Sequence, residues 1–168
     1  MKKIIGIPVL FLLGLYACNS GSSSENSSAD TTASKMADTS QAMATMPSAD
    51  TLPAVPADAK VFFRNLKNGA TVTSPVKIEM GVADMSVDSS GKVRPQSGHF
   101  HLLIDAGDST PKGIVIGKDS THIHYGNAQK EATINLSPGK HTLALQFADG
   151  IHRSYGSQLS TAITVTVK

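Results

Sequence analysis

Apolar and polar residues alternate with a period of two in several short segments between residues 60 and 168. The segments are residues 60–64, 76–82, 99–105, 132–136, 143–147 and 163–167. Alternation of this kind places the apolar side chains on one face of a β-strand. Turn sequences such as Lys67-Asn68-Gly69 and Ser137-Pro138-Gly139 separate the segments, and no stretch sustains the 3.6-residue period of a helix. The pattern predicts an all-β domain, an immunoglobulin-like antiparallel β-sandwich of about seven strands.

The first 18 residues follow a different pattern. Lys2 and Lys3 precede 14 apolar or small residues, from Ile4 to Ala17. This run is shorter than the ~20 residues that a spanning helix needs, and it fits the apolar region of a secretory signal. Leu15-Tyr16-Ala17-Cys18 resembles the lipoprotein box of bacteria. We therefore expect residues 1–17 to be a lipoprotein signal peptide and Cys18 to be lipidated.

The residue after Cys18 bears on the destination of the protein. Asn19 stands where an Asp would retain such lipoproteins at the inner membrane of many Gram-negative bacteria. The expectation is a protein of the bacterial cell envelope, lipid-anchored in the outer membrane and facing the periplasm or the cell surface.

Residues 18–59 are expected to form a disordered tether between this anchor and the β domain. Residues 19–59 contain 9 Ser, 9 Ala and 5 Thr, no aromatic residue, and only Leu52 and Val55 as large aliphatic residues. Such a segment buries too little apolar area to offset the conformational entropy that it would lose on folding. The folded domain is therefore predicted to begin at residue 60.

Charge and motifs exclude several functional classes. The chain has 15 Lys and Arg against 13 Asp and Glu, and 13 against 13 without Lys2 and Lys3. A nucleic-acid partner is not expected, because phosphate binding requires a concentrated excess of cations. The single cysteine excludes a disulfide within the monomer. No P-loop, Gly-x-Ser-x-Gly, His-Glu-x-x-His or Gly-x-Gly-x-x-Gly motif occurs, so the protein is not expected to be an enzyme.

Histidine is the one residue type that suggests specific chemistry. All six histidines fall within 54 residues, and four of them form two His-x-His pairs; the six are His99, His101, His122, His124, His141 and His152. On a strand, residues i and i+2 share a face and lie about 7 Å apart, so two imidazoles can approach one ion. We interpret all six as candidate ligands for Zn²⁺ or Cu²⁺. Asp105 and Asp149 are candidate acceptors for the free N–H of a ligating imidazole.

The position of the first pair in its strand is also predicted. Phe100, Leu102 and Ile104 form a wholly apolar face, which we assign to the core. His99 and His101 are then expected to face out of that sheet or to lie near its end. The alternative interpretation is that the histidines are structural, and that the domain is an interaction module for a protein or glycan of the envelope.

Several motifs together resemble a known family. They are Gly69-Ala70-Thr71-Val72, Ser74-Pro75-Val76, Gly98-His99-Phe100-His101-Leu102-Leu103-Ile104-Asp105, His122-Ile123-His124-Tyr125-Gly126, Pro138-Gly139-Lys140-His141-Thr142-Leu143 and Ile163-Thr164-Val165-Thr166-Val167. In this order they are similar to the bacterial exported family called domain of unknown function 4399, over residues 60–168. The family often has a third His where Phe100 stands, which implies that this position is not an obligatory ligand. The resemblance implies an exported all-β domain with a shared histidine pattern and supplies no reaction.

Overall fold

The structure is a computed structural model that describes residues 51–168. The predicted signal peptide, Cys18 and the tether up to residue 50 lie outside the described residues. No helix within residues 51–168 has the length and apolar character needed to cross a membrane. The elements are β1 (Lys60–Phe63), β2 (Ala70–Val72), β3 (Val76–Ala83), β4 (Ser86–Val87), β5 (Ser97–Ile104), β6 (His122–Tyr125), β7 (Glu131–Ile134), β8 (Gly139–Ala148), the 3₁₀ turn η1 (Ser157–Leu159) and β9 (Ser160–Val167).

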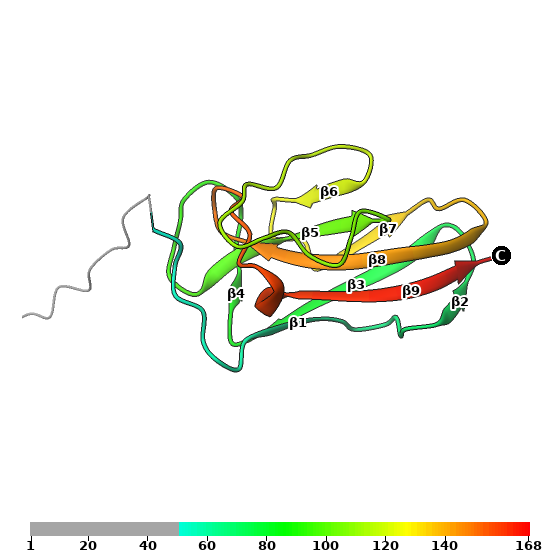
Figure 1. Cartoon of the computed structure of the whole chain (residues 1–168), viewed down its shortest axis with the longest axis horizontal. Coiled ribbons are helices and arrows are strands. Elements are labelled where there is room, and N and C mark those ends of the chain that lie inside the picture. The colour runs from blue at the N-terminus through cyan, green and yellow to red at the C-terminus, as the bar shows by residue number, and fades with distance from the viewer. Residues whose placement is uncertain (1–50) are drawn as a thin grey trace, which may run out of the picture. The chain divides into compact units, whose positions relative to one another are not determined.

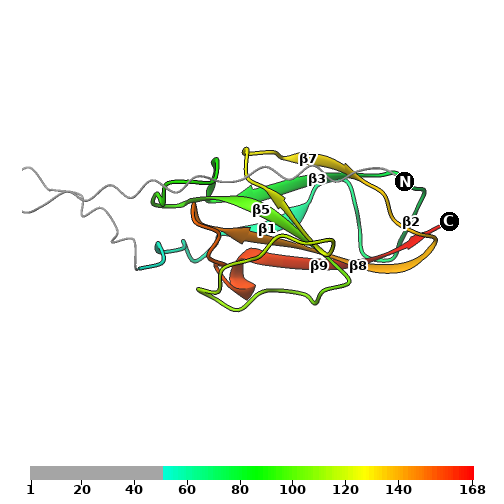
Figure 2. The ribbon, with the colours of Figure 1, turned by 90° about the horizontal axis from the view of Figure 1, so that it is seen from above.

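The strands form two sheets that pack face to face (Figure 1, Figure 2). One sheet has the order β1-β3-β7; the other has the order β2-β9-β8-β5-β4, with β6 also paired to β5. The predicted all-β sandwich is confirmed. Two short strands, β2 and β4, join the longer ones that alternation revealed, and both pair in parallel with their neighbours.

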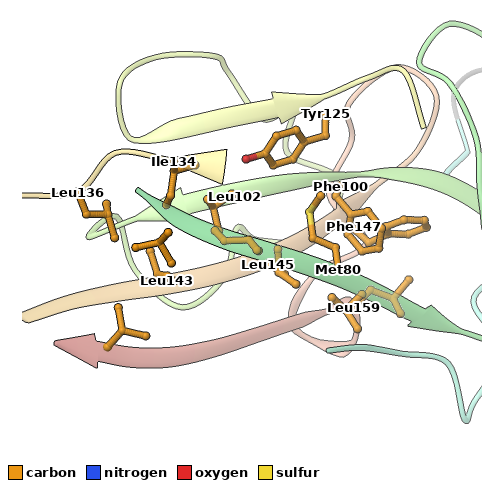
Figure 3. Close-up of a cluster of buried hydrophobic side chains, with 14 of the residues drawn as sticks. Met80, Phe100, Leu102, Tyr125, Ile134, Leu136, Leu143, Leu145, Phe147 and Leu159 are labelled. Atoms are coloured by element: carbon orange, nitrogen blue, oxygen red, sulfur yellow. The ribbon is translucent and has the colours of Figure 1, made fainter. Parts of the chain in front are cut away.

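The hydrophobic core lies between the two sheets (Figure 3). The three-stranded sheet contributes Ile78 and Met80, and the larger sheet contributes Phe100, Leu145 and Phe147, all fully buried. The rings of Phe100 and Phe147 meet edge to face, with centroids 5.0 Å apart. Each large side chain buried in this way contributes on the order of 1.5–3 kcal/mol. The core is therefore made from one face of each strand, as the alternation predicts.

The opposite face of β5 and β8 is buried as well. Leu103, Gln146 and Ala148 are at most 1% exposed. Two segments lie over this face, the connection between β5 and β6 and the one between β8 and β9, and Gln146 contacts both. Its Oε1 accepts from the N–H of Thr110 at 2.9 Å, and its Nε2 donates to the carbonyl of Gly156 at 3.0 Å. Figure 2 shows the connection between β5 and β6 on the side of this sheet away from β3 and β7. The outer face of β5 is thus covered by loops.

The loops also bury the first histidine pair, on the face where the sequence places it. His99 and His101 do point away from the core between the sheets, since they alternate with Phe100 and Leu102. However, they are 0% and 1% exposed, because the loops cover the face on which they lie. An apolar pattern on one face of a strand does not show that the other face meets solvent.

Residues 51–59, assigned above to the tether, lie against the sandwich. Leu52 and Val55 pack on the core cluster, and Ala59 is 3% exposed. Gln158 Nε2 donates to the carbonyl of Pro56 at 2.8 Å. The two large aliphatic residues of this segment therefore have a packing role.

Candidate metal centre

Four of the six histidines converge beneath the loops. His99 and His101 come from β5, His124 from β6, and His152 from the turn after β8. One potential ligand atom from each residue lies within 4.8 Å of all the others. We call these four residues the His cluster. Their ring centroids are 4.7–5.8 Å apart.

Strand pairing accounts for three of the four positions. β5 and β6 are antiparallel, and their register sets His101 opposite His124. His99 lies two residues before His101 on the same face of β5, so the three imidazoles share one patch of the sheet. The outer face of the sheet thus brings together both histidines of the first His-x-His motif and one histidine of the second.

Hydrogen bonds satisfy only part of the His cluster. His99 Nε2 lies 3.0 Å from His152 Nδ1 and 3.1 Å from His101 Nε2. His99 Nδ1, His101 Nδ1 and His124 Nε2 are buried and have no hydrogen-bond partner among the described residues. A buried polar atom without a partner costs about 1–3 kcal/mol. A cation bound to one nitrogen of each ring would replace the close nitrogen–nitrogen contacts between His99, His101 and His152.

The environment keeps the buried imidazoles neutral. Burial, followed by repulsion from the neighbouring His124 and His152, lowers the pKa of His99 to about 4. Burial, followed by the charge on His99, lowers the pKa of His101 to about 3. Burial also lowers the pKa of His124. Metal ions bind the neutral imidazole, so at neutral pH these ligands have no proton to lose.

A tight turn presents the fourth imidazole. His152 has a φ of 71°, in the left-handed region that residues other than Gly rarely adopt. The buried carboxylate of Asp149 accepts from the backbone N–H of Ile151 at 3.1 Å and of Arg153 at 2.9 Å. The Nε of Arg153 also donates to this carboxylate, at 2.7 Å. Asp149 therefore accepts hydrogen bonds from the backbone of the turn and from Arg153. The sequence instead predicted that it would accept from the free N–H of a metal ligand.

The connection between β5 and β6 holds the same turn from its other side. The N–H of Ile116 donates to the carbonyl of His152 at 2.9 Å, and the N–H of Ser154 donates to Ile114 at 2.9 Å. Val115 forms an isolated antiparallel bridge with Arg153. The position of His152 thus depends on two loops that are joined by backbone hydrogen bonds.

Two predicted ligands, His122 and His141, lie outside the His cluster, and so does the predicted acceptor Asp105. His141 Nδ1 lies 2.7 Å from Asp105 Oδ2, and its Nε2 donates to the carbonyl of Ser137 at 3.0 Å. These hydrogen bonds with Asp105 and Ser137 raise the pKa of His141. Asp105 thus supports His141, which ties the Ser137 turn to the end of β5. His122 pairs with Asp119, at 3.0 Å from Nδ1 to Oδ1.

Gly126 contributes to the site through a contact that the sequence does not reveal. A Cβ on Gly126 would lie 2.2 Å from His124 Cε1 and 2.3 Å from His124 Nε2. The ring of His124 therefore occupies the space in which any other residue at 126 would carry its side chain. A Gly two residues after a His-x-His motif is visible in the sequence, but its contact arises only when the chain folds.

The fold and the His cluster define the class of protein as an all-β sandwich with a histidine-rich candidate metal centre. A family model matches residues 78–168, more than half of the chain, including all four cluster histidines, and its description is Domain of unknown function (DUF4399). The chain belongs to this family. No curated protein and no solved structure matches the chain.

Proposed function

We propose that the protein is a non-catalytic metal-binding protein whose His cluster holds one Zn²⁺ or Cu²⁺. The observation that carries the proposal is that one potential ligand atom from each of four imidazoles lies within 4.8 Å of the other three. Imidazole is a good ligand for both ions, and the described residues contain no cysteine to compete with it.

The number of ligands favours storage, transfer or structural use of the ion over catalysis. Zn²⁺ with four protein ligands is closed, whereas catalytic zinc keeps a position open for water or substrate. Two of the ligands, His99 and His101, are buried beneath the loops. We therefore propose a metal-handling role with no chemical step.

We further propose that this domain acts at the cell envelope, anchored through lipid at Cys18. The lipoprotein box supports this part of the proposal. An extracytoplasmic location also suits a metal site made only of imidazole, since it does not depend on keeping a thiol reduced.

Metal analysis of the full chain tests the proposed site. Protein purified and loaded with Zn²⁺ or Cu²⁺ at pH 7.5 should retain about one ion per chain after desalting. At a free metal concentration a hundredfold above Kd, the free energy of unfolding should rise by ~2.7 kcal/mol. The double variant His99→Ala/His101→Ala should lose both effects, while His141→Ala, which removes a histidine outside the His cluster, should keep them. Far-UV circular dichroism reports whether each variant remains a β protein.

A second candidate function is an interaction module with structural histidines. The observation in its favour is a group of exposed apolar side chains next to His152: Ile114, Val115 and Ile151 are 54%, 60% and 40% exposed. If the wild-type protein binds neither ion and His99→Ala/His101→Ala unfolds the domain, the metal proposal is wrong and this second function is favoured.

A further inference from the structure

One histidine outside the His cluster adjoins it. His122 and His124 share a face of β6, about 7 Å apart along the strand. The register of β5 and β6 sets His122 opposite Leu103, one step along the same sheet from His101 and His124.

The imidazoles on this face differ in exposure. His99 and His101 are fully buried, and His124 is half-buried. The side chain of His122 is 28% exposed. An ion that approaches from solvent along β6 therefore meets His122 and His124 before the two buried histidines.

Asp119 orients His122 in the manner of a metal ligand. Its carboxylate accepts from the N–H of Thr121 at 2.7 Å and of His122 at 2.8 Å, and from the Thr121 hydroxyl at 2.8 Å. It also lies 3.0 Å from His122 Nδ1. With Nδ1–H donating to this carboxylate, Nε2 carries the free lone pair, as in the carboxylate–histidine pairs that support bound metals. Nε2 of His122 has no hydrogen-bond partner within residues 51–168.

A second Asp–His pair in the same domain shows what is particular about His122. His141 is held by Asp105 through Nδ1 in the same way, at 2.7 Å. Its Nε2 is bound to the carbonyl of Ser137 at 3.0 Å, so it has no ligand atom to offer. Of these two pairs, only His122 combines an available Nε2 with a place beside the His cluster.

We propose that His122 is the entry ligand of the metal centre. The inference rests on the proposed function and concerns how the ion reaches the His cluster. An incoming hydrated Zn²⁺ or Cu²⁺ exchanges water for Nε2 of His122 and a nitrogen of His124. Bonds to His99, His101 and His152 then form one at a time as the remaining water molecules and His122 leave the ion, with His124 a ligand in both positions.

The physical reason for such a step is desolvation. An ion that entered the buried site directly would lose its water before it gained ligands, and an uncompensated buried charge is very costly. Exchange of one ligand at a time keeps the ion coordinated throughout. Because an entry ligand lies on the path in both directions, it changes the rates of binding and release together and leaves Kd unchanged.

Stopped-flow measurement of Zn²⁺ and Cu²⁺ uptake by the full chain, and of release to a chelator, tests this role. His122→Gln should slow both uptake and release by about tenfold, a size of effect that residues around a metal site have on its affinity or activity. The Kd should change by less than about twofold. His141→Gln is the matched control, since it removes a histidine of the other Asp–His pair, and it should leave both rates unchanged.

The possible results separate this inference from the proposed function. Unchanged rates in His122→Gln would show that His122 is not an entry ligand. Weaker binding with faster release would also overturn the inference, because His122 would then be a permanent ligand. If the wild-type chain takes up no metal, the proposed function and the entry role are both wrong.

Discussion

The metal-free protein should lose stability as the pH falls from 7.5 to 5.5, because the His cluster resists protonation in the folded state. In the unfolded chain each imidazole takes up a proton near pH 6.5. In the folded protein, burial and neighbouring histidines lower the pKa of His99 to about 4 and that of His101 to about 3. Over this pH range the unfolded state binds more protons than the folded state, so the free energy of unfolding decreases as the pH decreases.

The pKa values give the size of the effect. At pH 5.5 an imidazole with an unfolded pKa of about 6.5 is almost fully protonated when unfolded, while His99 and His101 remain neutral when folded. The loss between pH 7.5 and 5.5 is on the order of 1 kcal/mol for each residue and about 3 kcal/mol for both. For a domain of this size that corresponds to a fall of roughly 10 °C in Tm. The lowered pKa of His124 acts in the same direction.

His141 opposes this loss. Its pKa is raised by Asp105, so its contribution to stability is fully present below about pH 6.5 and is lost as the pH rises through the raised, folded value. The variant His141→Gln should therefore be destabilised more steeply by acid than the wild type. The variant His99→Gln/His101→Gln should show the opposite change, with most of the pH dependence removed.

Urea denaturation of the full chain in EDTA at pH 7.5, 6.5 and 5.5 measures these changes. EDTA matters because bound metal would hold the imidazoles neutral and mask the effect. A wild-type protein as stable at pH 5.5 as at pH 7.5 would refute the reasoning. So would a double variant that keeps the full slope, because the titrating groups would then lie elsewhere.

Two further predictions concern other parts of the chain. Gly126→Ala should displace the ring of His124 and weaken metal binding by about 10–100-fold, as loss of support for a ligand does elsewhere; metal titration measures this. Gly117→Ala is its control, because a Cβ there meets nothing within 4 Å, and equal affinities in the two variants would contradict the assigned contact. Cys18→Ser should release the protein from the membrane fraction or leave the precursor unprocessed, as fractionation and mass spectrometry would show. A processed, membrane-bound variant would mean that the lipoprotein box is misassigned.

The long strands could be predicted from sequence because each has one apolar face. Residues 76–82 and 143–147 alternate over enough positions to define both the strand and its buried side, and β3 and β8 contain them. The strands β2 and β4 have three and two residues, too few to show any period. Their existence depends on the neighbours β9 and β5, which supply the backbone partners.

The His cluster could be predicted only in part. The two His-x-His motifs indicate that imidazoles meet, but the register between β5 and β6 decides that His124, and not His122, lies opposite His101. The position of His152 depends on the turn that Asp149 holds and on backbone hydrogen bonds from a loop more than thirty residues earlier. The separation of His141 likewise follows from Asp105, which is distant in sequence and adjacent in space. These contacts are tertiary, and no spacing rule contains them.

The energetics of the His cluster connect the fold to the proposed function. The core between the sheets is complete with Phe100 and Leu102 on the inner face of β5, so His99 and His101 are not needed to fill it. On the outer face, the described residues leave three buried ring nitrogens without partners, and His152 adopts a left-handed backbone conformation. Each of these features destabilises the metal-free fold by about 1–3 kcal/mol, whereas apolar residues on the same covered face would stabilise it. Structural Zn²⁺ sites bind with about 10–16 kcal/mol, which is comparable with or larger than the summed cost of such a site. A buried group of imidazoles that weakens the empty domain is therefore consistent with a domain that works with its metal bound.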